Sequence, residues 1–213
     1  MTHKQLSDAQ TIWEKLPDWQ HYDQVLAFAK DQFPDNTHFE PVLLKVALLD
    51  RLYRTNVYDL IQAANRVVQI FGTMPDLSGI DKVVQLSDVT SNGERHLTSF
   101  ASKYVHIFHD DSVPIYDSYA AFALTCHWGY PQSQIDKWRE DYSGYCQSID
   151  DLKRRSCVSA QARQMDRYLW LAGNWLWLQK RREKAGINKE LRAFFEDSAN
   201  RHFAEATFGG LLK

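Results

Sequence analysis

The stretch "SFASKYVHIFHDDSVPIYDSYAAFAL", residues 99–124, holds a single lysine, Lys103, near the start of an apolar run with helical periodicity. Fourteen residues later Asp117 stands between Tyr116 and Ser118, near the start of a second such run. An amine and a carboxylate thus lie at the near ends of two consecutive apolar helices. This arrangement is the strongest functional signal in the sequence.

The rest of the chain also repeats its apolar residues with the helical period. The segment "HFEPVLLKVALLDRLYR" (38–54) places Phe39, Leu43, Val46 and Leu49 on one face, and Thr37 with Glu40 predicts a capping box at its start. The longest predicted helix ends near Gly186, and residues 188–208 repeat their apolar residues with the helical period after it. No alternating run bounded by hairpin turns is present. The sequence predicts an all-α fold of about nine or ten helices, in a single domain spanning 1–213.

Composition excludes several classes of protein. The chain has 213 residues, 44% apolar and 24% charged, as in ordinary globular proteins. No apolar stretch approaches the roughly 18 residues of a membrane span, and no signal-peptide core follows the N-terminus. The three cysteines, Cys126, Cys146 and Cys157, are odd in number and widely spaced, so they predict reduced thiols in a cytoplasmic protein.

Charge is distributed unevenly along the chain. Residues 151–213 carry 13 Lys and Arg against 7 Asp and Glu, whereas residues 1–150 carry 12 against 20. The basic clusters "KRR" (153–155) and "KRREK" (180–184) could face phosphates. They could equally form a solvated helix face.

Two other motifs are interpreted as structural. The aromatic run "YLWLAGNWLW" (168–177) could stack on bases, but Trp170, Leu171, Trp175 and Leu178 follow helix spacing and predict core packing. His106 and His109 are spaced like metal ligands, yet no third ligand follows at a recognisable spacing. We therefore expect neither a metal nor another cofactor.

The segment "LTSFASK" (97–103) combines small residues at alternate positions with a lysine. Small residues let another backbone approach closely, and free N–H groups at a helix start bind phosphate. The segment resembles the hairpin of the helix-hairpin-helix (HhH-GPD) DNA glycosylases, apolar-x-Gly-x-Gly-x-Lys, with Ser99 and Ala101 in the glycine positions. In that family a short Val/Pro-x-Asp segment begins the next helix, as "VPIYDS" (113–118) does here, at a slightly shorter interval. The resemblance implies that Lys103 and Asp117 are the catalytic pair of a helix-hairpin-helix region at about 88–127.

The resemblance also implies an architecture and a DNA-binding surface. The family fold has two helical lobes and a central cleft, which would place Lys103 and Asp117 face to face and return the C-terminal helices (159–205) to the N-terminal lobe. The implied contacts to DNA are the hairpin residues Ser99, Phe100, Ala101 and Ser102, the residues Tyr53, Arg54, Thr55 and Asn56 that would fill the gap left by an extruded base, and the base-pocket positions Arg201 and His202. Tyr53 is the best single candidate for the residue that fills this gap.

The pair suits cleavage of the bond between C1′ and a base. A desolvated amine can attack C1′, and a carboxylate can deprotonate the nucleophile and stabilise the positive charge on the sugar. A lysine attacker leaves a Schiff base, which permits strand cleavage at the abasic site. Without the family pattern, Lys103 would be a surface lysine and Asp117 an acid favoured by the helix dipole.

No motif specifies the base. The divergent hairpin resembles phage-defence glycosylases, which remove bulky modified pyrimidines such as glucosylated hydroxymethylcytosine. Two alternatives are an enzyme that acts on hypermodified thymine nucleotides and a non-catalytic helical DNA-binding module. The expected partner is duplex DNA with a flipped-out base, bound by a monomer that needs no membrane.

Overall fold

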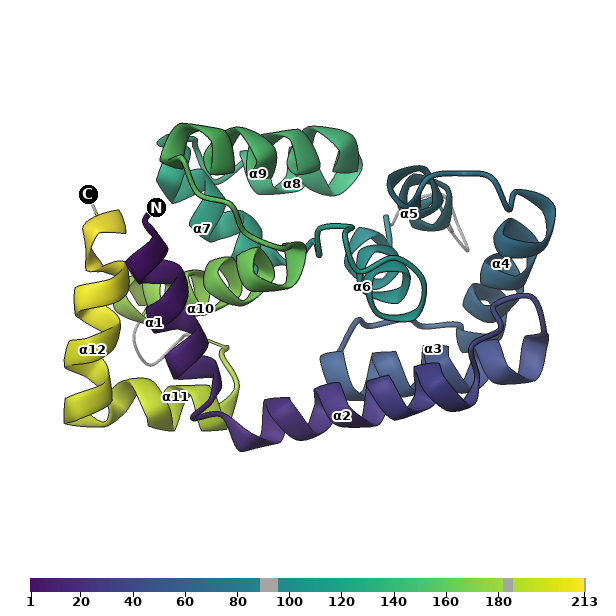
Figure 1. The fold of residues 1–213 in the computed structure, drawn as a ribbon, viewed down its shortest axis with the longest axis horizontal. Coiled ribbons are helices and arrows are strands. Elements are labelled where there is room, and N and C mark those ends of the chain that lie inside the picture. The colour runs from purple at the N-terminus through teal and green to yellow at the C-terminus, as the bar shows by residue number, and fades with distance from the viewer. Residues whose placement is uncertain (89–95, 182–185, 213) are drawn as a thin grey trace. The chain divides into compact units, whose positions relative to one another are not determined.

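A computed structural model describes residues 1–88, 96–181 and 186–212, and folds them into twelve α-helices and one 3-10 helix without a strand (Figure 1). The predicted all-α class is confirmed, with more helices than the nine or ten expected. The chain divides into two compact units. Unit 1 comprises Met1–Gln20, Asp117–Trp138 and Gly144–Lys213, and unit 2 comprises His21–Tyr116 and Arg139–Ser143.

The helices follow this division, apart from three that contain residues of both units. Unit 1 contains α1 (His3–Trp13), α7 (Ser118–Trp128), α10 (Ala162–Arg181), α11 (Lys189–Glu196), α12 (Ser198–Phe208) and the 3-10 helix η2 (Gly209–Leu211). Unit 2 contains α3 (Phe39–Tyr53), α4 (Leu60–Thr73), α5 (Gly79–Ser87) and α6 (Thr98–Phe108). The three shared helices are α2 (Pro17–Gln32), α8 (Gln134–Glu140) and α9 (Tyr142–Ser156).

Helix α6 is the core of unit 2. It packs against α5 and α3, and α4 packs against both of these helices. Nine of its eleven residues are buried, including the polar residues Thr98, Ser102, Lys103 and His106. A polar group that leaves water must find a partner inside the protein, so the packing of α6 determines where its hydrogen bonds go.

The predicted start of α3 is wrong. His38 is the N-cap residue and makes no side-chain capping bond. Thr37 does not pair with Glu40, because its N–H and its hydroxyl both donate to Asp35 Oδ1, each at 2.7 Å. Asp35, two residues earlier, accepts both hydrogen bonds of Thr37, as in an Asx turn, so Thr37 cannot cap the helix.

The buried face of α3 is also shifted from the prediction. Val42, Lys45, Val46 and Leu49 are buried, whereas Phe39 and Leu43 are half-buried. A lysine therefore occupies the apolar face, where the periodicity alone predicts an apolar residue.

Unit 1 is organised around the contact between α7 and α10. Helices α1 and α12 pack on α10 and on one another. Arg167 Nη1 on α10 donates to Gln10 Oε1 on α1 at 2.9 Å, and Gln5 Nε2 on α1 donates to the carbonyl oxygen of Thr207 on α12 at 2.8 Å. The C-terminal helices thus hold the N-terminal helix within unit 1.

The aromatic run of α10 packs in the core, as predicted. Trp175 is 1% exposed, and Leu171 and Leu178 are also buried. Trp170 is half-buried and meets the rings of Trp13 and Trp19 edge to face, with centroids 6.0 and 4.6 Å away. These rings join α10 to α1 and to the start of α2.

The single helix expected over 188–208 is two helices, α11 and α12. Asp197 has an extended backbone (φ −63°, ψ 132°) that ends α11. Its side chain accepts a hydrogen bond from the Asn200 N–H at 3.0 Å and so caps α12. The apolar period continues across the break, which is why the sequence pattern conceals it.

The sequence predicts neither a membrane span nor a disulfide. None of the helices within the described ranges is long and apolar enough to cross a membrane. The thiols of Cys126, Cys146 and Cys157 are all free, and that of Cys157 is exposed.

Gly173 allows the close approach of α10 to α7. A Cβ atom at this position would lie 1.9 Å from the carbonyl oxygen of Tyr119 on α7. We expect Gly173→Ala to lower the free energy of unfolding by about 2–3 kcal/mol, because backbone atoms of two packed helices must separate. Urea denaturation followed by circular dichroism measures the change.

Gly72 provides a matched control. It is also helical, and nothing lies within 4 Å of its ideal Cβ position. Gly72→Ala should leave the free energy of unfolding unchanged or raise it by up to about 1 kcal/mol. Equal stabilities of the two variants would show that α7 and α10 do not meet at Gly173.

The same helix pair contains a buried titratable contact. His127 Nε2 on α7 lies 2.9 Å from the Tyr168 hydroxyl on α10. Burial lowers the pKa of His127 to about 4, and the positive charges of the Met1 amine and Arg155 act in the same direction. Burial also raises the pKa of Tyr168.

His127 should therefore make the stability of the chain sensitive to acid. An unfolded histidine titrates near pH 6.5, so between about pH 6.5 and 4 the unfolded chain binds more protons than the folded chain. The free energy of unfolding therefore decreases as the pH is lowered through this interval. Between pH 7 and 4.5 this group should contribute a loss of roughly 2 kcal/mol. His127→Gln should lose that much less in urea denaturation over the same interval, and an unchanged pH dependence would contradict the assignment.

Candidate functional site

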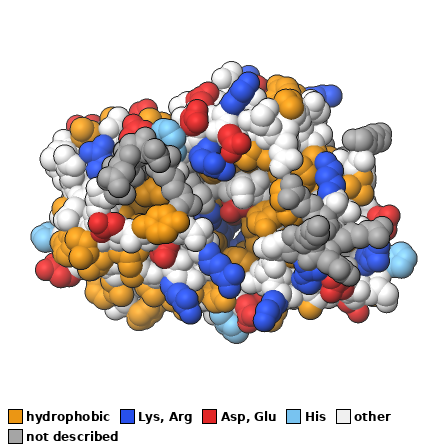
Figure 2. Space-filling view, turned by 180° about the vertical axis from the view of Figure 1, so that it is seen from behind, with side chains coloured by type: hydrophobic (Ala, Val, Ile, Leu, Met, Phe, Trp, Pro, Cys, Tyr) orange, Lys and Arg blue, Asp and Glu red, His pale blue; other side chains and the backbone are white. Residues whose placement is uncertain are grey.

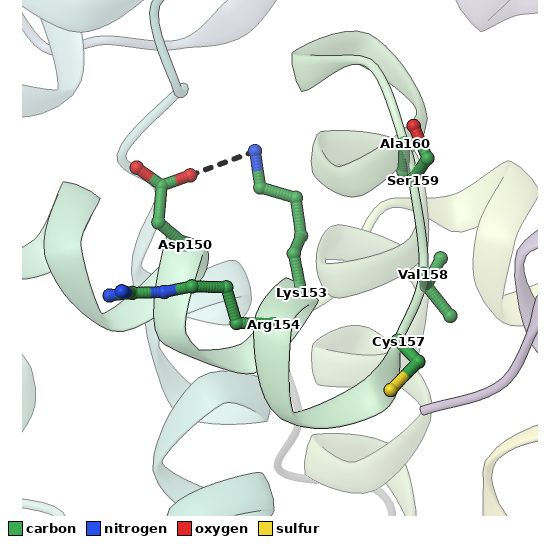
Figure 3. A pocket seen from close by; sticks show the side chains of 7 residues that line it. All are labelled: Asp150, Lys153, Arg154, Cys157, Val158, Ser159 and Ala160. Carbon is green, nitrogen blue, oxygen red and sulfur yellow. Dashed lines mark ion pairs between the residues drawn. The ribbon is translucent and has the colours of Figure 1, made fainter.

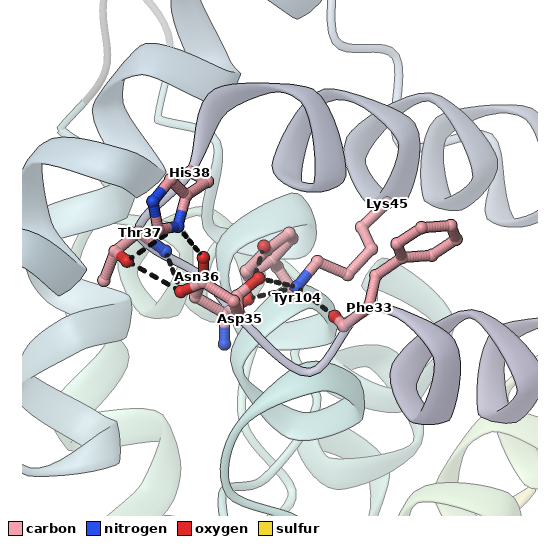
Figure 4. A network of polar contacts seen from close by, with 7 residues as sticks. All are labelled: Phe33, Asp35, Asn36, Thr37, His38, Lys45 and Tyr104. Carbon is pink, nitrogen blue, oxygen red and sulfur yellow. Dashed lines mark hydrogen bonds and ion pairs between the residues drawn. The ribbon is translucent and has the colours of Figure 1, made fainter.

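Unit 2 contains three buried lysines, and the first of them is Lys45 on α3. Its Nζ donates to the carbonyl oxygen of Phe33 at 3.0 Å, to that of Asp35 at 2.7 Å and to Asn36 Oδ1 at 2.6 Å (Figure 4). The Tyr104 hydroxyl of α6 donates to the same Asn36 oxygen at 2.7 Å. Lys45 therefore links the segment between α2 and α3 to the central helix.

Electrostatics in this network follow from burial and from neighbouring charge. Burial lowers the pKa of Lys45 to about 8, and the Asp35 carboxylate partly offsets this. Hydrogen bonds from Thr37 and then His38 lower the pKa of Asp35, while burial raises that of Tyr104. Three acceptors match the three donors of the Lys45 ammonium group, which indicates a structural lysine.

Lys82 on α5 has the same kind of surroundings. It is 2% exposed, and its Nζ donates to the carbonyl oxygen of Pro75 at 2.8 Å and to that of Leu77. The Phe71 ring centroid lies 5.6 Å from the same nitrogen. Lys82 thus fixes the turn between α4 and α5, which is also a structural role.

Lys103 differs from the other two in its partner. It is 4% exposed, so the alternative of a surface lysine is wrong. Its Nζ donates to Ser99 Oγ at 2.7 Å, one turn earlier on α6. A hydroxyl can accept from an ammonium group or donate to a free amine, whereas a carbonyl oxygen can only accept. The Ser99 hydroxyl thus differs chemically from the carbonyl oxygens that bind Lys45 and Lys82.

The start of α6 lies earlier than the sequence suggests. The helix begins at Thr98, so Lys103 is in its second turn rather than its first. The Ala101 N–H donates to the Leu97 carbonyl oxygen at 2.9 Å, so the amides of Thr98, Ser99 and Phe100 precede the first hydrogen bond of the helix. Thr98 and Phe100 are buried, and Ser99 is half-buried. Residues 89–95 of the predicted helix-hairpin-helix region lie outside the described residues.

The side chains of the predicted hairpin are mostly inside unit 2. Phe100, Ala101 and Ser102 are buried and Ser99 is half-buried. Ser102 Oγ accepts from the Tyr116 N–H at 2.9 Å, so α6 fixes the backbone of the residue before Asp117. Phe100, Ala101 and Ser102 are at most 1% exposed as whole residues, so Ser99 is the hairpin residue of this group that reaches the surface.

Asp117 is the N-cap residue of α7. Its Oδ1 accepts from the Tyr119 N–H at 2.9 Å, and its side chain is half-buried. The alternative role of a helix N-terminal acid is therefore realised, although capping uses only one of its two carboxylate oxygens. Lys103 belongs to unit 2 and Asp117 to unit 1.

The predicted gap-filling residues occupy the loop after α3, which ends at Tyr53 as expected. The Tyr53 hydroxyl donates to Asp23 Oδ1 at 2.6 Å, and the ring is half-buried. Thr55 is buried, and Arg54 and Asn56 are exposed with positive φ values of 50° and 56°. A non-glycine residue in this conformation carries strain, so the surrounding structure must hold it.

Asp50 holds this loop, and an unpredicted aromatic residue projects from it. Asp50 Oδ1 accepts from Thr55 Oγ1 and from the Val57 N–H, each at 2.9 Å. The next residue, Tyr58, is 86% exposed, and Ile61 on the first turn of α4 is 59% exposed. Sequence reasoning missed Tyr58. The signal in the sequence is that Tyr58 directly precedes Asp59, the N-cap residue of α4, and so belongs to the apolar face of neither α3 nor α4.

The two predicted base-pocket residues lie on the exposed face of α12. Arg201 and His202 are both exposed, and His202 Nδ1 donates to the Ser198 carbonyl oxygen at 2.7 Å. The bond is internal to the helix.

A surface cavity of about 690 Å³ lies at the end of α9, and none of the predicted site residues lines it (Figure 3). It is lined by Asp150, Lys153, Arg154, Cys157, Val158, Ser159 and Ala160. Asp150 pairs with Lys153 at 2.8 Å and Asp151 pairs with Arg154, so both lining cations are neutralised. The cavity therefore has no excess charge to attract an anion.

Basic side chains do not form one continuous field on the face shown in Figure 2, where Lys and Arg alternate with Asp and Glu. Residues 182–185 of the second basic cluster lie outside the described ranges. The described part of the chain contains no group of three metal-ligating side chains. His106 Nδ1 donates to the Val113 carbonyl oxygen at 2.7 Å, and His109 packs edge to face on Phe71.

Comparisons with known proteins identify relatives. The family model described as "HI_0787_N: N-terminal domain" matches residues 4–112. An uncharacterized protein of Haemophilus influenzae is 30% identical over 149 residues, which cover 65% of this chain and 69% of the relative. No solved structure matches the chain significantly. The family match includes Lys103 and the loop after α3 but ends before Asp117. The chain therefore belongs to the HI_0787_N family.

Proposed function

We propose that this chain is a DNA glycosylase of the helix-hairpin-helix type, in which Lys103 attacks C1′ of an extruded nucleotide. The observation that carries the proposal is the environment of the Lys103 amine, buried to 4% exposure and hydrogen-bonded to a serine hydroxyl. Buried lysines are rare and need partners.

The proposed reaction begins with the free amine of Lys103. Its lone pair forms a bond to C1′ as the bond from C1′ to the base breaks, and the base leaves with the electron pair and takes up a proton. Ring opening of the sugar then gives a Schiff base on Lys103. Water hydrolyses it, or β-elimination first cleaves the strand on its 3′ side.

Asp117 supplies the negative charge in this proposal. Its carboxylate accepts the proton that Lys103 loses and stabilises the cationic sugar. This role requires the two-lobed fold in which the N-terminus of α7 approaches Lys103 across a central cleft.

DNA would be held through backbone amides and exposed residues. In the first turn of α6 only Ser99 reaches the surface, and its amide is suited to a phosphate, since a helix start carries partial positive charge. The strained loop after α3 would enter the gap left by the extruded base. The proposed substrate is a bulky modified pyrimidine, and the chain acts as a cytoplasmic monomer in defence against phage.

Borohydride trapping on a duplex with one abasic site tests the nucleophile. The unmodified chain should become covalently attached, because borohydride reduces the Schiff base to a stable amine. Lys103→Gln should abolish trapping, whereas Lys137→Gln, at an exposed lysine of unit 1, should not. Retained binding of abasic DNA by Lys103→Gln would show that the variant is folded.

Base release separates the roles of the two residues. Mass spectrometry of bases released from genomic DNA of phages with different modified bases identifies the substrate. On that substrate Asp117→Asn should slow release by about 100-fold or more, and the double variant should be little worse than the poorer single variant. Full release by Lys103→Gln would mean that water is the attacker, and full activity of both single variants would rule out the glycosylase.

The loop after α3 gives a test of base extrusion. Because Tyr58 is 86% exposed and Tyr53 is tethered to Asp23, Tyr58→Ala should reduce excision from duplex DNA more than from single strands. Tyr53→Ala should reduce both equally, through a loss of stability. If Tyr53→Ala alone shows a loss of excision that is specific to duplex DNA, then Tyr53 rather than Tyr58 fills the gap left by the extruded base.

A further inference from the structure

The basic cluster 153–155 contains one arginine whose charge is not neutralised. Lys153 and Arg154 each pair with the aspartate three residues earlier, Asp150 and Asp151. Three residues before Arg155 the chain has Leu152, so the helix offers no acid at that position. Arg155 is exposed, and within the described ranges it makes no ion pair.

Arg155 lies instead on an aromatic stack of unit 1. Its guanidinium carbon is 5.3 Å from the ring centroid of Trp128, at the end of α7. The rings of Trp128 and Tyr130 are stacked, with centroids 6.2 Å apart and planes 21° from parallel. Tyr130 is 48% exposed, so one part of the stack faces water.

The backbone keeps this stack in place. Gly129 ends α7 in the left-handed conformation (φ 68°), which reverses the chain direction between the two rings. The Tyr130 N–H donates to the Thr125 carbonyl oxygen at 2.9 Å. The ring of Tyr130 also meets that of Trp138 at 6.1 Å, so the stack is supported from α8.

The local field around the stack is positive. Arg155 and the Met1 amine lie close enough that each adds to the lowering of the pKa of His127, after burial as the main cause. The charge of Arg155 also contributes, again after burial, to a lowered pKa of the Met1 amine. No carboxylate contributes to either shift.

We propose that Trp128, Tyr130 and Arg155 form a binding surface for single-stranded nucleic acid, hereafter the stacking surface. An unpaired base stacks on the exposed ring of Tyr130, and Arg155 binds the adjoining phosphate through its guanidinium group. A flat aromatic ring beside an uncompensated guanidinium group matches the alternation of bases and phosphates along a strand. The inference rests on the proposed function for the identity of that strand as DNA, and it adds a contact remote from the reaction.

The distance along α7 defines where the strand would be held. Asp117 caps one end of this eleven-residue helix and Trp128 is its last residue, so the helix separates them by about 16 Å. A strand with the rise of B-form DNA covers that length in about five nucleotides. The stacking surface would therefore bind an unpaired flank of the target site rather than the target base.

Fluorescence anisotropy with a labelled oligothymidylate of about 15 nucleotides tests the inference on the full chain. Tyr130→Ala should weaken binding about tenfold, within the range for loss of one stacked base. Arg155→Gln should weaken it by a similar factor and reduce the slope of log affinity against log salt by about 0.7, the value for one phosphate contact on a single strand. Tyr130→Trp should retain full affinity, because it keeps the stacking ring.

Two matched controls separate the stacking surface from general effects. Arg154→Gln removes a neighbouring arginine that is paired with Asp151, and Phe28→Ala removes an aromatic ring that is 64% exposed on α2. Each should change the affinity less than about twofold. Thermal melting of every variant within a few degrees of the unmodified chain shows that folding is intact.

The outcomes distinguish this inference from the proposed glycosylase. Weakened oligothymidylate binding with no borohydride trapping supports the stacking surface and rejects Lys103 as the nucleophile of the proposed glycosylase. Unchanged affinity in both Tyr130→Ala and Arg155→Gln overturns the stacking surface, even where trapping occurs. Tighter binding of an acidic polyglutamate peptide than of oligothymidylate of equal charge also overturns it, because the surface would then fit an acidic protein.

Discussion

Helix α6 is buried on nearly all sides, and this constraint organises unit 2. A helix interior to a protein cannot leave polar side chains to water, so each needs a partner on a neighbouring element. Tyr104 meets Asn36 and thereby Lys45, His106 meets the Val113 carbonyl oxygen, and Ser102 meets the backbone of Tyr116. These bonds fix segments on both sides of α6 in the sequence. Lys103 instead bonds within the helix, to Ser99 Oγ one turn earlier.

The fold class followed from the sequence because helical periodicity is strong in almost every segment. The ends of α3 at Tyr53 and of α7 at Gly129 were marked by ordinary local signals. The start of α3 was mispredicted, because Asp35 competes for Thr37 through a contact outside the helix. The break at Asp197 was hidden because both helices bury the same apolar stripe.

The candidate site was only partly readable. Lys103 and Asp117 stood out by their spacing, and the structure adds that the first is buried and the second caps α7. Tyr58 could not be ranked above Tyr53 from the sequence, because exposure depends on the loop that Asp50 holds. The sequence distinguishes Arg155 from Lys153 and Arg154 by the residue three positions earlier, but it does not show that Arg155 lies on the ring of Trp128, which comes from another helix. Buried Lys45 and Lys82 were also hidden, since lysine usually marks the solvent side of a helix.

The order of the segments has a consequence for synthesis on the ribosome. Unit 2 is almost continuous in sequence, so most of its contacts become available once α6 has emerged. Unit 1 cannot close at that stage, because α1 packs on α10 and α12, which are translated more than 140 residues later. The apolar face of α1, including Ile12 and Trp13, must therefore remain uncovered while the intervening chain is made. The nascent chain thus offers chaperones an exposed aromatic segment for most of its synthesis time.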